Sequence, residues 1–132
     1  MAGYRDLNTK SINDGNIDYE KMLKDIPSRY SDVVKANFKH IEKYGKENGL
    51  TQKQVEDLKK MEVIVARTYY LNERNEQARR SNDALAKRDI ARNEAELAAL
   101  EAQYNKMSNR LGRHANDIND YIDKQNTKKS TR

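Results

Sequence analysis

The chain has 132 residues, of which 36% are charged, with a formal net charge of +5 and no cysteine. The lack of cysteine excludes disulfides, thiolate metal sites and cysteine nucleophiles, and no segment approaches the roughly 20 apolar residues of a membrane-spanning helix. With one proline and five glycines, this composition favours a single all-α domain. We expect a soluble, cytoplasmic protein that does not contact a membrane.

Residues 1–25 are predicted to form a polar N-terminal arm. A turn cluster at Asn13–Asn16 interrupts any regular structure there. Beyond it, a few apolar residues have the spacing of one short helical turn that could dock on another part of the chain: Ile17, Tyr19, Met22 and Leu23.

Residues 26–49 are predicted to be an N-terminal helical segment. Pro27 suits the first turn of a helix, and Gly45 and Gly49 are expected to end it. The apolar face consists of Tyr30, Val34, Phe38, Ile41 and Tyr44. The opposite face carries four lysines at steps of four, four and three: Lys35, Lys39, Lys43 and Lys46. These ammonium groups are a candidate DNA contact that would follow phosphates without reading sequence, and the alternative is an ordinary solvated face.

The next helix is predicted to begin at Thr51. Thr51 and Gln54 have the spacing of a capping box, and Leu50 and Val55 that of a hydrophobic staple. A broad apolar stripe follows and includes Val65 and Tyr69. The polar stretch from Asn72 to Asp83 either reverses or continues as one rod; we favour a reversal, with Ser81 or Asp83 capping the next helix, because the flanking stripes need each other for burial.

The strongest pattern in the chain runs from residue 85 to residue 111. Its apolar residues follow heptad spacing: Ile90, Leu97, Leu100, Tyr104, Met107 and Leu111. A helix of this length would span about 40 Å, so an elongated shape is expected. Residues 51–111 are therefore predicted to be a helical hairpin whose surplus apolar surface drives oligomerisation, with contacts at Val65, Tyr69, Ile90, Leu97, Leu100, Tyr104, Met107 and Leu111.

Residues 112–132 are predicted to be a flexible, basic C-terminal tail with at most a short helix near residues 115–124. Residues 105–132 contain seven basic and three acidic residues, and such an excess suggests a polyanion or an acidic protein as partner. The candidate partner contacts in this tail are Lys124, Lys128, Lys129 and Arg132.

No catalytic constellation is visible in the sequence. It contains no glycine-rich phosphate loop, no His-Glu metal motif and no serine elbow, so we expect a non-enzymatic protein without a cofactor or a bound metal. The start of a repressor-type helix-turn-helix at residues 49–58 lacks the break and recognition helix that this motif requires.

The order of these parts resembles the small terminase subunit of tailed bacteriophages. The resemblance covers residues 26–115 and rests on layout together with Gly49-Leu50-Thr51, Val55, Leu58, Tyr70 and Leu111-Gly112. It implies a ring assembled through the hairpin, recognition of viral double-stranded DNA, and regulation of a large terminase subunit that holds the ATPase and nuclease. The missing complete helix-turn-helix, which some family members have, leaves the mode of DNA recognition open.

Two other functions fit the same features. One is a helical scaffold or structural interaction protein that binds no nucleic acid. The other is a small DNA-binding regulator, which should be a dimer on a palindromic site.

Overall fold

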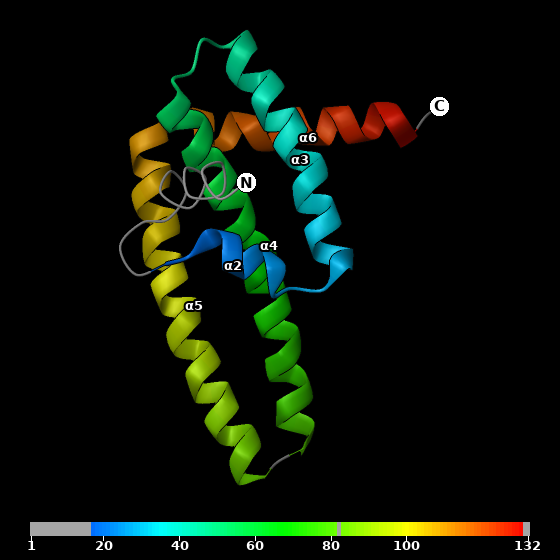
Figure 1. Cartoon of the computed structure of the whole chain (residues 1–132), viewed down its shortest axis with the longest axis vertical. Coiled ribbons are helices and arrows are strands. Elements are labelled where there is room, and N and C mark those ends of the chain that lie inside the picture. Colours follow the sequence, from blue (N-terminus) through cyan, green and yellow to red (C-terminus); the bar gives the residue numbers. More distant parts are fainter. Residues whose placement is uncertain (1–16, 82, 131–132) are drawn as a thin grey trace, which may run out of the picture.

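A computed structural model describes residues 17–81 and 83–130, with the side chains of residues 128–130 excepted. The described residues are all-helical, as the composition predicts. Their five helices are α2 (Tyr19–Lys24), α3 (Ser28–Glu47), α4 (Gln52–Ser81), α5 (Ala84–Leu111) and α6 (His114–Ser130) (Figure 1). None of the described helices combines the length and the apolar character needed to cross a membrane.

The two longest helices, α4 and α5, lie side by side and run antiparallel (Figure 1). Two side-chain pairs mark their register: Arg67 pairs with Glu96, and the Asn93 amide donates a hydrogen bond to Oδ1 of Asn75 at 2.9 Å. Between the helices, Asp83 caps α5, because its carboxylate accepts the backbone N–H of Ala86 at 2.7 Å. The ends of α4 and α5 that meet near residue 82 project beyond the other helices.

The remaining three helices pack around the other end of this pair. Helices α2 and α3 contact α4, and α6 lies against α3 and α5. The apolar side chains that form the core come from all five helices and the α2–α3 turn: Tyr19, Ile26, Val34, Ile41, Tyr44, Leu58, Met61, Val63, Ile64, Ala66, Leu71, Leu100, Met107, Leu111, Ala115, Ile118 and Ile122. Tyr19 is fully buried, so the predicted short helical turn does dock on the body of the molecule.

The boundary between α3 and α4 follows the local signals in the sequence. Thr51 and Gln54 exchange both hydrogen bonds of a capping box, at 2.8 and 3.1 Å. Gly49 has φ +65, and the N–H of Leu50 bonds back to the carbonyl of Gly45 at 2.9 Å, which is the Schellman ending that glycine favours.

Gly45 has a different role from the helix ending that we expected. Helix α3 continues past it to Glu47. A Cβ at this position would lie 2.6 Å from Cγ2 of Val55, so glycine lets the end of α3 approach the start of α4 closely. Long-range packing, and not the local backbone, explains this glycine.

The prediction of a flexible C-terminal tail is wrong for residues 114–130. These residues form α6, which includes the short helix expected near residues 115–124 and extends it. Ala115, Ile118 and Ile122 are buried in the core. Their spacing of three and four places them on one helical face, and α3 supplies the apolar surface that this sparse stripe needs.

Candidate functional site

One face of the α4–α5 pair carries an open, largely apolar groove of about 730 Å³. Its walls include Val65 and Tyr69 from α4, and Leu97 and Tyr104 from α5. Helix α2 does not cover this groove, because α2 borders a pocket formed by Arg67 and by other residues on the opposite side of the pair. Tyr69 is 63% exposed and Val65 36% exposed, so apolar side chains line a surface that nothing in the described chain covers.

The eight residues predicted for oligomerisation do not share one surface. Val65, Tyr69, Leu97 and Tyr104 line the groove, and Ile90 is half-buried on α5. Leu100, Met107 and Leu111 instead lie in the protomer's own core. Their side chains are buried by the folded chain itself and are not available to a second copy, which corrects the prediction for these three residues.

The lysine face of α3 consists of Lys35, Lys39, Lys43 and Lys46, all of them exposed. None of the four forms an ion pair within the described part of the chain, although Asp32 and Glu42 lie on the same side of the helix by helical spacing. The carboxylate of Glu42 is already bound by Lys59 at 2.6 Å. The structure therefore brings the four ammonium groups together on one exposed helical surface, as predicted. Asp32 is the acidic residue on this surface other than Glu42.

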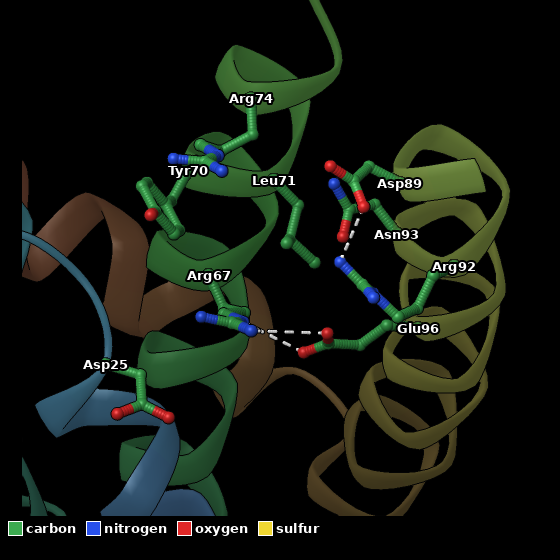
Figure 2. Close-up of a pocket in the computed structure, with 9 residues that line it drawn as sticks. All are labelled: Asp25, Arg67, Tyr70, Leu71, Arg74, Asp89, Arg92, Asn93 and Glu96. Atoms are coloured by element: carbon green, nitrogen blue, oxygen red, sulfur yellow. Dashed lines mark hydrogen bonds and ion pairs between the residues drawn. The ribbon is translucent and has the colours of Figure 1, made fainter. Parts of the chain in front are cut away.

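A polar pocket of about 290 Å³ lies on the other side of the α4–α5 pair. Figure 2 shows three arginines and three carboxylates around it: Arg67, Arg74, Arg92, Asp25, Asp89 and Glu96. Each carboxylate has a basic partner: Glu96 has Arg67, Asp89 has Arg92, and Asp25 has Lys21. The pocket has no net charge and its acidic groups are engaged, so it is a polar seam between helices and not a poised acid–base site.

The sequence did not reveal a buried ionic cluster near the base of α4. Asp57 and Lys60 are both about 2% exposed, and Arg110 of α5 donates to both carboxylate oxygens of Asp57 at 3.2 and 3.3 Å. Helical spacing alone would have placed these charges on a solvated face. The cluster ties α4 to α5 and is separate from both candidate surfaces.

The remaining predictions concern the basic C-terminal residues, metal binding and His114. Lys124 is exposed on α6, whereas the side chains of Lys128 and Lys129 and all of Arg132 lie outside the described residues. Within the described residues no group of three His, Cys, Asp or Glu side chains could hold a metal ion. His114 serves the fold, since its Nδ1 lies 2.8 Å from the Tyr44 hydroxyl.

The chain matches no protein-family model, no curated protein and no solved structure. The functional argument therefore rests on the groove, the lysine face and the charges described above.

Proposed function

We propose that the protein is a self-assembling helical adaptor that binds duplex DNA and has no catalytic activity of its own. The observation that carries this proposal is the open groove on the α4–α5 pair, with its exposed Val65 and Tyr69. A groove lined by exposed apolar side chains is a candidate interaction site, because burying its apolar surface is favourable by roughly 25 cal/mol per Å².

The occupant of the groove is a second copy of the chain. The exposed rim on α5 carries Glu94 and Glu101, whereas the chain as a whole has a net charge of +5. A basic surface of a neighbouring copy would complement this acidic rim. Ala98 lines the groove and is exposed, and Ala95 and Ala102 are also exposed on α5; these small side chains leave room for a neighbouring helix to approach closely. The α4–α5 pair would in this way act as the hairpin through which copies join.

Duplex DNA is the proposed partner of the lysine face. Four exposed ammonium groups on one helix can bind successive phosphates, and an oligomer repeats this contact in every subunit. Weak individual contacts then add up to useful affinity. Binding of this kind is independent of sequence and falls steeply as salt rises.

The biological setting that these features favour is viral DNA packaging, as in the small terminase subunit of tailed bacteriophages. In that role the oligomer is a ring, the lysine face holds viral DNA, and the protein regulates the ATPase and nuclease of a large terminase subunit in the host cytoplasm. Lys124 and the basic residues after it are the proposed contact for the large subunit.

The assembly is tested by the mass of the purified protein in solution. Val65→Asp places a charge in the groove and should reduce the particle to the 15.4 kDa protomer. Val33→Asp is a matched control, because Val33 is 54% exposed on α3 and outside the groove. Light scattering should show a large particle for the wild type and for Val33→Asp. A wild-type monomer at micromolar concentration would exclude the proposal.

The main alternative is a scaffold that binds no nucleic acid, because the groove by itself indicates assembly but not DNA binding. A DNA-binding measurement distinguishes the adaptor from the scaffold. The adaptor should bind duplex DNA with an affinity that falls as salt rises. Lys39→Gln combined with Lys43→Gln should weaken this binding without changing the particle mass. A wild-type oligomer that does not bind duplex DNA at about 50 mM salt would instead be the scaffold.

A further inference from the structure

The projecting end of the α4–α5 pair is strongly basic. Four exposed cations lie within ten residues of sequence: Arg79, Arg80, Lys87 and Arg88. We call this surface the basic tip. Asp83 is the only acidic residue among residues 77–88, so this segment has a net charge of +3, and Glu76 and Asp89 flank it. Figure 1 shows that this end of α4 and α5 extends away from α2, α3 and α6, and it is therefore accessible from several sides.

The charges of the basic tip are not neutralised inside the protomer. The carboxylate of Asp83 is used to cap α5, and Arg79 has only a long, exposed contact of 3.9 Å with Glu94. Arg80, Lys87 and Arg88 make no ion pair with any described residue.

The helix dipole does not favour the positions of Lys87 and Arg88. Both are close to the N-terminus of α5, where the helix dipole is positive and cations are unfavourable, and the first turn of α5 contains no acidic residue. Arg79 and Arg80, by contrast, lie in the last turn of α4, where the helix dipole favours cations. The local helix environment therefore accounts for Arg79 and Arg80, whereas Lys87 and Arg88 are exposed cations whose charge remains available to a partner outside the chain.

An apolar side chain stands among these cations. Leu85 in the first turn of α5 is 68% exposed, more than Tyr69 in the groove. Cations around a projecting apolar side chain match the surface of duplex DNA, where basic residues hold phosphates and an apolar residue can enter the minor groove beside the bases.

We propose that the basic tip is a second duplex-DNA contact, in which Arg79, Arg80, Lys87 and Arg88 bind phosphates and Leu85 lies against the minor groove. The choice of duplex DNA as partner rests on the proposed function, whereas the charge and exposure of the tip do not. Together with the lysine face of α3, the tip gives each subunit two separate basic surfaces for one polyanion.

The test is the salt dependence of binding to a random-sequence duplex of about 30 base pairs, measured by fluorescence anisotropy from about 50 to about 300 mM NaCl. Each phosphate contact contributes about 0.9 to the slope of log affinity against log salt. Arg80→Gln combined with Arg88→Gln should therefore reduce the slope by about 2 for each subunit that contacts the duplex. Leu85→Ala should lower the affinity and leave the slope unchanged, because an apolar contact releases no counterions.

A matched control is Arg92→Gln, which removes an arginine of α5 that is paired with Asp89 at 2.8 Å; its slope should equal that of the wild type. Circular dichroism and light scattering should show that all variants remain folded and assembled. If the wild type binds DNA and only the Lys39→Gln, Lys43→Gln variant loses slope, the inference about the tip is wrong and the proposed function stands.

A second outcome would overturn the tip proposal together with the DNA part of the proposed function. If the wild type does not bind duplex DNA at about 50 mM salt, the DNA part of the proposed function fails, and the tip proposal fails with it. Binding to vesicles of phosphatidylglycerol then tests an anionic lipid surface as the partner. Binding to them that is lost in the Arg80→Gln, Arg88→Gln variant would assign the tip to an anionic lipid surface instead.

Discussion

The environment of the Glu62 carboxylate shifts its pKa. Glu62 lies on α4, partly buried against α3, where the Asn37 amide donates a hydrogen bond to its Oε2. Burial raises the pKa of Glu62 above its usual range, and the hydrogen bond from Asn37 partly offsets this by favouring the ionised form. The folded state therefore holds the Glu62 proton more tightly than the unfolded chain does.

The sign of the resulting pH dependence follows from linkage. Between the usual carboxyl pKa and the raised pKa of Glu62, the folded state binds more protons, so the contribution of Glu62 to stability falls as pH rises through that window. Above it the penalty is constant. Glu62→Gln should thus be more stable than the wild type at pH 7 and lose this part of the pH dependence, as measured by urea unfolding across the acidic range. Glu76→Gln, on the exposed side of α4, controls for loss of charge alone; equal gains in both variants would contradict the prediction.

At the scale of elements, α6 shows how a weakly apolar helix becomes part of the core. Tyr121 packs edge-on against Tyr44 of α3 with ring centroids 5.4 Å apart, and Ile118 and Ile122 are buried. Few apolar residues suffice here because α6 packs on both α3 and α5.

The docking of α6 predicts a large effect from one side chain. Ile118→Ala should reduce the free energy of unfolding by about 2–5 kcal/mol, since it removes buried methyl groups and leaves a cavity. Asn116→Ala, on the exposed side of the same helix, should change it by no more than about 0.5 kcal/mol. Denaturant unfolding of both variants gives the comparison. Equal stability of Ile118→Ala and the wild type would mean that α6 is not docked in solution.

At the scale of the whole molecule, assembly should contribute to stability. A partner that binds only the folded state raises the free energy of unfolding with its concentration. The melting temperature of the wild type should therefore rise with protein concentration, whereas that of Val65→Asp should be nearly constant. The melting temperature can be measured by calorimetry or circular dichroism over a hundredfold range of protein concentration. For one binding site, a ligand at about 100 times its Kd stabilises the folded state by about 2.7 kcal/mol. A wild-type melting temperature independent of concentration would argue against self-association.

The sequence by itself determined the helical class and several helix ends, because these depend on residues close together in the chain. The capping box of Thr51 and Gln54, the positive φ of Gly49 and the Asp83 cap all follow local rules. The lysine face of α3 was readable for the same reason: helical period alone places its four members together. The four cations of the basic tip are close in sequence. Only the structure showed that they lie together at the exposed end of the α4–α5 pair.

Tertiary structure decided which apolar residues lie inside the protomer. The heptad spacing of α5 predicted both Leu97 and Leu100 at an interface between copies. In the structure Leu100 is buried in the core, and Leu97 lines the open groove. Gly45 and α6 differ from their predictions for the same reason. Burial depends on which distant segments pack on a residue, and a periodic pattern specifies a helical face but not the partner that covers it.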